Sequence, residues 1–189
     1  MTLHLNRRGF LQASAAGAAW LMVGPNARAL DLNGKLRLAA IGAGGKGQDD
    51  LLNVAASPRC EVVALCDVDH SAKIFGWAVE KFPRAHQYSD FRRLLDKPDA
   101  FDAVTVSTPD HMHAPIAVAA MQLGKHVFCQ KPLTHTVAEA RRMRGVAQEN
   151  RVITQMGNQI QSHPAYRTAV KLLQDGVIGK VREVHAWQS

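Results

Sequence analysis

The sequence contains few cysteines, few aromatic side chains and no tract of low complexity. Its three cysteines, Cys60, Cys66 and Cys129, form no CxxC pair, so neither a zinc ribbon nor a disulfide framework is indicated. Cys66 and Cys129 lie within apolar runs, where we expect them to act as small buried side chains. The sequence has no repeat of solenoid length, which excludes a repeat array, and its composition argues against a disordered or fibrous chain.

Acidic residues are the scarcer charged class, with 16 Asp and Glu against 23 Lys and Arg, which gives a formal net charge of +7. Residues 1–29 hold Arg7, Arg8 and Arg28 but no acid, so the remainder carries 20 basic and 16 acidic residues, a net charge of +4. No run of Lys and Arg with interleaved aromatic residues occurs, and we therefore expect no nucleic-acid binding.

The first 29 residues have the three-part layout of a secretory signal. Arg7 and Arg8 make the start basic, an apolar stretch of small residues covers 11–24, and Ala27-Arg28-Ala29 fits a cleavage site. The apolar stretch is short and rich in Ala and Gly, so we expect no stable membrane insertion. An uncleaved anchor or an amphipathic helix is the alternative.

The segment Arg7-Arg8-Gly9-Phe10-Leu11 resembles the twin-arginine export signal, although Asn6 and Gln12 depart from the usual residues at their positions. The resemblance implies that residues 1–29 are a signal peptide cleaved near Ala29. It also implies that the twin-arginine export machinery carries the folded protein to the periplasm with its cofactor already bound. Residues 30–35 are then a short linker.

Beyond the linker, apolar runs alternate with segments of helical periodicity. The runs that predict strands are 36–41, 61–66, 103–107, 126–129 and 152–155. The segments that predict helices are 48–56, 71–82, 91–95, 114–123, 136–150 and 165–175. This alternation favours right-handed βαβ units, so we predict an α/β fold with a doubly wound parallel Rossmann sheet over residues 36–160. Residues 161–189 are predicted to hold a connecting helix and, at 181–188, the first strand of a truncated second α/β domain.

A glycine-rich turn, Gly42-Ala43-Gly44-Gly45-Lys46-Gly47, fits the pattern G-x-G-x-x-G between the first predicted strand and the first predicted helix. Glycines at this spacing allow a tight turn, close approach of the backbone to a pyrophosphate, and close packing of the helix on the strand. Backbone N–H groups at the start of the helix then face the phosphates. The candidate phosphate-binding residues are Gly42, Gly44, Gly45, Lys46 and Gly47.

Asp67 ends the second predicted strand, 20 residues after Gly47. A carboxylate at this place can accept hydrogen bonds from adenosine ribose hydroxyls and would repel a 2′-phosphate, which favours NAD over NADP as the cofactor. Asp69 is a substitute candidate for this role. A simpler interpretation makes Asp67 only a turn or helix-start residue.

Two further clusters follow predicted strands, where the carboxyl ends of parallel strands face the ligand crevice. The first is Thr108-Pro109-Asp110-His111-Met112-His113, whose two histidines and carboxylate could hold a metal ion. Contacts to cofactor or substrate are favoured, because Pro109 forces a turn and no other ligand set lies nearby in sequence. The second cluster is Cys129-Gln130-Lys131-Pro132, in which a lysine could transfer a proton or hold a substrate oxygen. By spacing alone, Lys131 is equally well explained as a surface lysine before a proline turn.

These three clusters together resemble the N-terminal domain of the glucose–fructose oxidoreductase / inositol dehydrogenase (Gfo/Idh/MocA) family, which combines a glycine turn, a T-P-[N/D]-x-x-H turn and an E-K-P motif. The resemblance covers residues 36–189 and implies that Lys131 is the catalytic or substrate-orienting lysine. Gln130 departs from the family's Glu and carries no charge, but it can still bind a ribose hydroxyl. The resemblance also implies that Thr108, Pro109 and His113 line the nicotinamide side, and that Asn158 or Gln159 touches the cofactor or the substrate.

The same resemblance implies an NAD-dependent oxidoreductase that acts on a sugar, cyclitol or related carbohydrate by hydride transfer. In this family a second α/β domain supplies most of the substrate pocket, a further catalytic residue and the surface through which a homo-oligomer would form. The chain ends inside the expected first strand of that domain, so we expect it to be truncated. Two alternatives stay open: an NAD-dependent glycoside hydrolase that oxidises its sugar transiently, and a non-catalytic fragment that binds the cofactor.

Overall fold

The computed structural model describes residues 34–187, except for the side chain of Gln159. The expected signal peptide at 1–29 lies outside the described residues. The chain divides after Lys35, and the unit that follows, Leu36–Ser189, carries the fold. No helix among residues 34–187 has both the length and the apolar character that crossing a membrane requires.

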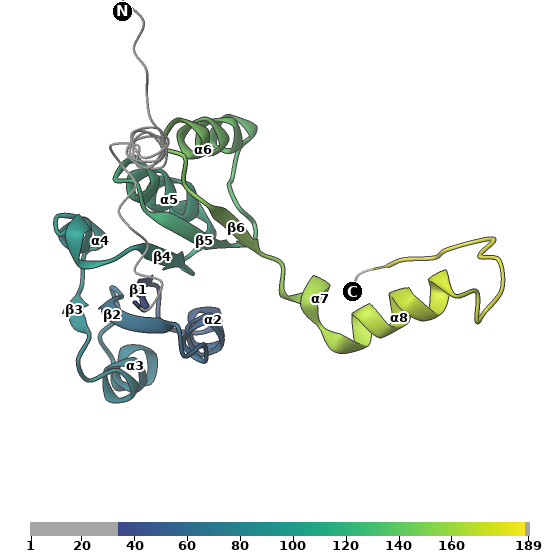
Figure 1. The fold of residues 1–189 in the computed structure, drawn as a ribbon, viewed down its shortest axis with the longest axis horizontal. Coiled ribbons are helices and arrows are strands. Elements are labelled where there is room, and N and C mark those ends of the chain that lie inside the picture. The colour runs from purple at the N-terminus through teal and green to yellow at the C-terminus, as the bar shows by residue number, and fades with distance from the viewer. Residues whose placement is uncertain (1–33, 188–189) are drawn as a thin grey trace, which may run out of the picture. The chain divides into compact units, whose positions relative to one another are not determined.

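A six-stranded parallel sheet organises this unit (Figure 1). Its strands are β1 Leu36–Ile41, β2 Cys60–Cys66, β3 His86–Tyr88, β4 Ala103–Val106, β5 His126–Gln130 and β6 Thr154–Gly157. They are arranged in the order β3-β2-β1-β4-β5-β6, and all five pairings are parallel. This is the strand order of a doubly wound dinucleotide-binding sheet, so the predicted fold class is confirmed.

The helices that follow the strands are mostly those that the periodicity predicts. They are α2 Lys46–Ala55, α3 Trp77–Lys81, α4 Phe91–Leu95, α5 His113–Gln122 and α6 Val137–Glu149, with a π-helical turn, Ala72–Gly76, leading into α3. A capping box begins α6, because Thr136 Oγ1 accepts from Glu139 N and the Glu139 carboxylate accepts from Thr136 N.

Alternation along β1 explains why the sheet has a core on each face. Leu38 and Ala40 belong to one apolar cluster, which contains Leu51 of α2 and Ala78 of α3. Ala39 and Ile41 of the same strand belong to the other cluster, which α4, α5 and α6 complete. Because successive side chains of a strand point to opposite faces, a strand that is buried on both sides reads as a continuous apolar run.

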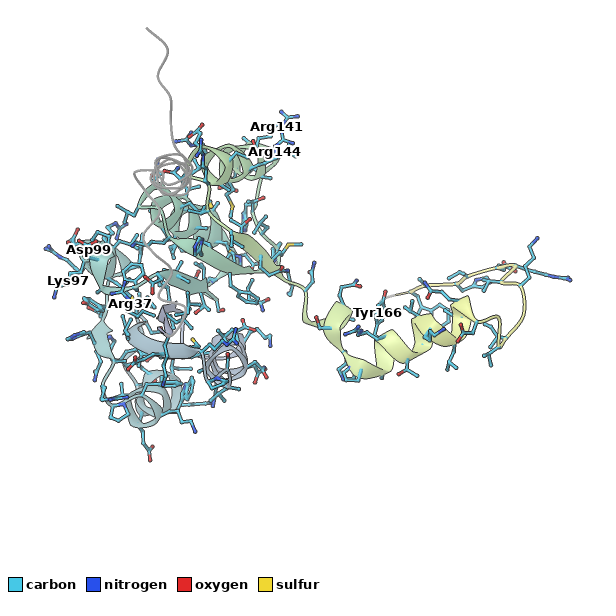
Figure 2. All side chains as sticks on the ribbon, viewed as in Figure 1. Arg37, Lys97, Asp99, Arg141, Arg144 and Tyr166 are labelled. Atoms are coloured by element: carbon cyan, nitrogen blue, oxygen red, sulfur yellow. The ribbon has the colours of Figure 1, made fainter. Side chains whose placement is uncertain are left out.

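An ion pair fixes the amino end of β1 to the loop before β4. The Arg37 guanidinium lies 2.6 Å from one oxygen of Asp102, and both Arg37 Nε and the Arg37 backbone N donate to the other oxygen at 3.1 and 3.0 Å. Arg37 also donates to the Asp99 carbonyl at 2.7 Å, and Figure 2 shows the two residues close together.

Two expectations differ from the structure. The strand β3 was not placed by the sequence pattern, because it has only three residues and both His86 and Gln87 are exposed. The predicted strand at 181–188 is wrong over its described part, since residues 181–187 form no strand and are exposed. A strand needs a hydrogen-bonded neighbour, and no strand among residues 34–187 pairs with this segment.

The segment after β6 contains two helices, α7 Gln159–Ser162 and α8 Pro164–Gln174. The second confirms the helix predicted at 165–175. None of the residues of α8 is buried, and Leu172 and Leu173 are each 46% exposed.

Candidate functional site

The carboxyl ends of the central strands lie together at one edge of the sheet. Ile41 of β1 is in register with Cys66 of β2 and with Val106 of β4, and Val106 is in register with Cys129 of β5. The segments that follow these strands therefore share one edge, as the sequence predicts. They are the glycine turn 42–47, residues 67–71, residues 107–113 and residues 131–132.

The glycine turn is packed so tightly that side chains would collide in it. Gly42 has φ +88°, and a Cβ there would lie 2.6 Å from both the carbonyl carbon and the carbonyl oxygen of Ser107. A Cβ on Gly47 would overlap the carbonyl oxygen of Gly42. At Gly45 an added Cβ would meet nothing within 4 Å, so the N-terminus of α2 faces open space. The start of a helix is a place where phosphate binds, and here Gly47 N and Gln48 N also donate to the carbonyl oxygens of Gly44 and Gly45 at 2.9 and 3.2 Å.

Asp67 braces this turn. Its Oδ2 accepts a hydrogen bond from Ala43 N at 2.7 Å, and its Oδ1 accepts from Asp69 N at 3.0 Å. The carboxylate is only half-buried, so further lone pairs can take hydrogen bonds from a ligand. Asp69 accepts from Ser71 N at 2.8 Å, and this hydrogen bond lowers the pKa of its exposed carboxyl. Asp67 thus stabilises the glycine turn through its hydrogen bond with Ala43 N, and its carboxylate can still accept hydrogen bonds from ribose hydroxyls.

Trp77 is a site residue that the sequence analysis did not single out. Its indole Nε1 donates to the carbonyl oxygen of Ala43 at 3.1 Å, so a hydrogen bond joins the start of α3 to the glycine turn. The predicted helix over 71–82 contained this residue as an apolar position, and nothing in that periodicity indicated its hydrogen bond.

Thr108 and His113 bring the second cluster to the same edge. Thr108 Oγ1 is buried and has no hydrogen-bond partner among the described residues. His113 is 1% exposed, and its ring nitrogens lie 2.7 Å from the carbonyl oxygen of Pro132 and 2.8 Å from that of Thr108. The buried imidazole therefore connects the loop after β4 with the loop after β5. Pro109 and His111 are exposed. Among residues 34–187, no group of three His, Cys, Asp or Glu side chains could hold a metal ion.

In the third cluster, Gln130 points inward and Lys131 lies at the surface. The Gln130 side chain is 4% exposed, and its Oε1 accepts from the backbone N of Lys131 at 3.1 Å. Gln130 is in register with Gly157 of β6, where a Cβ would lie 2.6 Å from Gln130 Nε2. Lys131 and Asn158 are both exposed and directly follow these two paired residues. The two candidates thus extend from neighbouring strand ends.

Asp50 is the charged group that sequence reasoning missed. It is 6% exposed, and its carboxylate accepts from Ser107 Oγ at 2.8 Å and from Gln130 Nε2 at 3.0 and 2.8 Å. Lys46 Nζ lies 3.3 Å from Asp50 Oδ1. Burial alone would lower the pKa of Lys46, but the hydrogen bonds and negative charges of Asp50 and Asp49 outweigh burial, so the pKa is raised. The buried residues of α2 are Gly47, Asp50 and Leu51. Their spacing puts Asp50 on the stripe that faces the sheet, which is the signal that could have identified it.

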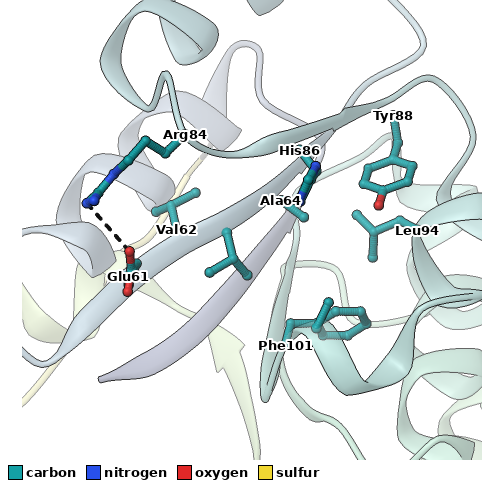
Figure 3. Close-up of a pocket in the computed structure, with 10 residues that line it drawn as sticks. Glu61, Val62, Ala64, Arg84, His86, Tyr88, Leu94 and Phe101 are labelled. Carbon is teal, nitrogen blue, oxygen red and sulfur yellow. Dashed lines mark ion pairs between the residues drawn. The ribbon is translucent and has the colours of Figure 1, made fainter. Parts of the chain in front are cut away.

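Two cavities in the described part of the chain are lined by other residues than those of this edge. One, of about 240 Å³, is lined by β2, β3 and the residues before β4, with an ion pair of 3.5 Å between Arg84 and Glu61 (Figure 3). The other, of about 540 Å³, lies among α5, α6, β5 and β6. Neither of these two cavities is lined by the glycine turn, Asp67 or Lys131.

Comparison with known proteins identifies the chain's relatives. The profile of the family described as "Oxidoreductase family, NAD-binding Rossmann fold" (GFO_IDH_MocA) matches residues 36–158. A levoglucosan dehydrogenase of Pseudarthrobacter phenanthrenivorans is 30% identical over 156 residues, 77% of this chain and 39% of that protein. An inositol 2-dehydrogenase of Salmonella paratyphi B is 31% identical over 155 residues, 79% of this chain and 45% of that protein. A glycosyl hydrolase family 109 protein of Stenotrophomonas maltophilia is 36% identical over 135 residues, 67% of this chain and 29% of that protein.

A solved structure with a similar fold is that of KijD10, a 3-ketoreductase from Actinomadura kijaniata, in complex with NADP. It has a TM-score of 0.69 and 30% sequence identity, and the match covers 78% of this chain and 46% of that chain. The chain spans less than half the length of each of these relatives. The family profile covers all six strands and every segment of the candidate edge. The chain therefore belongs to the Gfo/Idh/MocA oxidoreductase family, and residues 36–158 form its NAD(P)-binding Rossmann fold.

Proposed function

We propose that this chain binds NAD(H) and is the cofactor-binding part of an oxidoreductase that transfers hydride to or from a sugar, cyclitol or related carbohydrate. The observation that carries the proposal is the shared strand edge, where the glycine turn, Asp67 and Lys131 follow β1, β2 and β5. The levoglucosan and inositol dehydrogenases among the relatives support the carbohydrate class of substrate.

The residues at this edge fit a nicotinamide dinucleotide. The open N-terminus of α2 beside Gly45 suits the pyrophosphate, and the free lone pairs of Asp67 suit the adenosine ribose. The buried and unpartnered Thr108 Oγ1 needs a hydrogen-bond partner that a bound ligand would supply. Asn158 and Pro109, both exposed, flank the nicotinamide side in this proposal.

NAD rather than NADP is proposed because Asp67 and Asp69 follow β2, and a carboxylate at this place in a dinucleotide-binding fold would repel a 2′-phosphate. The test is Asp67→Asn, which keeps an oxygen for Ala43 N but removes the charge. We expect the affinity for NADPH relative to NADH to rise roughly tenfold, the order expected for one charge at short range near a surface. Energy transfer from tryptophan to the reduced nicotinamide measures both affinities, with the remote Asp96→Asn as control. An unchanged ratio would contradict the role of Asp67.

Lys131 is the proposed catalytic residue. The bound nicotinamide supplies the hydride acceptor or donor, and the Lys131 ammonium would hold the substrate oxygen and exchange a proton with it. We expect Lys131→Met in the complete enzyme to abolish NAD reduction with myo-inositol or levoglucosan, while NADH affinity stays within about threefold. Turnover that survives this substitution would remove Lys131 from the mechanism.

A glycoside hydrolase that uses NAD transiently is the second candidate, and the glycosyl hydrolase family 109 relative favours it. The two candidates differ in their cofactor balance. A dehydrogenase converts one NAD to NADH per turnover, whereas this hydrolase would release sugar with no net change in NADH absorbance.

We further propose that residues 1–29 are a twin-arginine signal peptide that directs the protein to the periplasm. Support comes from Arg7, Arg8 and the cleavage pattern at Ala27-Arg28-Ala29. A reporter that matures only after folded export, fused to these residues, tests the proposal. Export should stop when both arginines become lysine, and export unaffected by that change would exclude the twin-arginine route. Homo-oligomerisation through a second domain stays a prediction.

A further inference from the structure

Asp50 is a buried carboxylate whose partners come from three separate parts of the site. Lys46 belongs to the glycine turn, Ser107 directly precedes Thr108, and Gln130 directly precedes Lys131. Ser107 and Gln130 are 57 and 80 residues away from Asp50 in sequence. One side chain on α2 therefore joins the ends of β4 and β5 to the phosphate-binding turn.

The hydrogen bonds of Asp50 determine which way the Gln130 amide faces. A carboxylate only accepts, so the NH₂ group of Gln130 must face Asp50, where it donates to both oxygens at 3.0 and 2.8 Å. The amide oxygen of Gln130 is then directed at the backbone N of Lys131, from which it accepts at 3.1 Å. The packing of Gly157 against the same amide leaves no room for a large displacement.

The same geometry explains why residue 130 is glutamine. A glutamate there would place its own carboxylate against Asp50 in a buried site where two like charges cannot both stay ionised. The positive charge of Lys46, whose Nζ lies 3.3 Å from Asp50 Oδ1, already balances the carboxylate of Asp50. Asp50 and Gln130 thus form a matched acceptor and donor, and a change in one requires a change in the other.

We propose that Asp50 is a positioning residue that orients Gln130 and, through it, holds the backbone of Lys131 against the cofactor edge. The inference deepens the proposed function and rests on it where turnover is concerned. Asp50 does not touch the reacting atoms in this proposal. Its effect passes along the hydrogen bonds from Asp50 to Gln130 and from Gln130 to the N–H of Lys131.

The test is a cycle of substitutions at positions 50 and 130, measured by amide hydrogen exchange at Lys131. Gln130→Glu should speed exchange of the Lys131 N–H about tenfold or more, because the repelled carboxylate leaves its place. The double variant Asp50→Asn with Gln130→Glu reverses donor and acceptor, and it should restore exchange to within about threefold of the original rate. Asp50→Ala, which removes the acceptor and adds no charge, should speed exchange as well, whereas Asp50→Asn alone should not.

Turnover and cofactor binding separate positioning from general stability. In the complete enzyme, Gln130→Glu should lower kcat about 10²-fold, the order expected when a catalytic group moves by about an ångström. Its NADH affinity, read from tryptophan fluorescence, should stay within about threefold, because the buried Gln130 amide is held by Asp50 and the Lys131 N–H rather than by a ribose hydroxyl of the cofactor. Asp96→Asn is the control, since Asp96 is an exposed carboxylate at the end of α4, outside the hydrogen bonds of Asp50, and should change neither quantity.

Two results would overturn the proposal: Lys131 exchange unaffected by both Gln130→Glu and Asp50→Ala, or a double variant that fails to restore exchange. If Gln130→Glu does not fold, the exchange rates of the Lys131 N–H in Asp50→Ala and in the double variant still test the proposal. Failure of the proposed function would look different, because the unsubstituted protein would then bind no NADH while the exchange cycle at Lys131 could still be measured.

Discussion

Replacing Gly47 by alanine tests the closest packing in the glycine turn. An alanine Cβ would overlap the carbonyl oxygen of Gly42 and lie 2.9 Å from its carbonyl carbon and 3.3 Å from Ser107 Cβ. The first two neighbours are backbone atoms, which cannot turn away as a flexible side chain could. The end of β1 and the start of α2 must therefore separate.

The expected magnitude is the balance of two opposing effects. Overpacking of a tight site costs up to about 3 kcal/mol, while alanine gains at most about 1 kcal/mol of helix propensity over glycine. The net loss is about 2 kcal/mol of unfolding free energy, which lowers Tm by about 4–8 °C for a unit of this size. Gly145→Ala in α6 is the matched substitution, because the nearest atom to its Cβ is Glu149 Oε1 at 3.9 Å. It should gain about 1 kcal/mol instead.

Urea unfolding of the two variants beside the unsubstituted chain, followed by circular dichroism, measures both changes. The midpoint of Gly47→Ala should fall and that of Gly145→Ala should rise, with the same dependence on urea concentration. If Gly47→Ala is as stabilising as Gly145→Ala, the close contact between the turn and Gly42 is refuted.

Two further predictions concern titratable groups. Burial raises the pKa of the Cys66 and Cys129 thiols to about 12, so an aromatic disulfide reagent at pH 8 should label neither in the folded chain and both after unfolding in urea; rapid labelling of either in the folded chain would contradict this. The hydrogen bond from Arg37 lowers the pKa of Asp102, against the opposing effect of burial, so this carboxylate stabilises the fold above its unfolded pKa and the contribution is lost as pH falls. Asp102→Asn should therefore cost about 1 kcal/mol at pH 7, and a difference that does not shrink below about pH 4 would contradict the ion pair.

Elements whose residues contact the core were predictable from the sequence. The bounds of β1 and α4 agree with the predicted 36–41 and 91–95, because apolar periodicity reports directly which side chains are buried. The alternating residues 181–187 had the pattern of a strand, but pairing depends on a neighbour that local sequence does not describe. The three residues of β3 gave no periodicity at all, since the sheet alone makes them a strand.

The candidate site was predictable only in part for a similar reason. Glycines, Asp67 and Lys131 were found because each lies beside a strand end in the sequence itself. Asp50 was missed because its partners Ser107 and Gln130 are brought to it by folding. His113 was expected from the family resemblance to line the nicotinamide side, whereas the structure buries its ring between the carbonyls of Thr108 and Pro132.

The strand order β3-β2-β1-β4-β5-β6 has a consequence for how ligand binding and folding are linked. The strands β1, β2, β4 and β5 each precede a different segment of the candidate edge, so no single βαβ unit contains the whole site. A partly folded chain would then have almost no affinity for the dinucleotide, and bound ligand would oppose the opening of any of the strands. At a concentration of 100 Kd this linkage adds about 2.7 kcal/mol to the free energy of unfolding. Bound dinucleotide would therefore stabilise the whole sheet against unfolding rather than one strand of it.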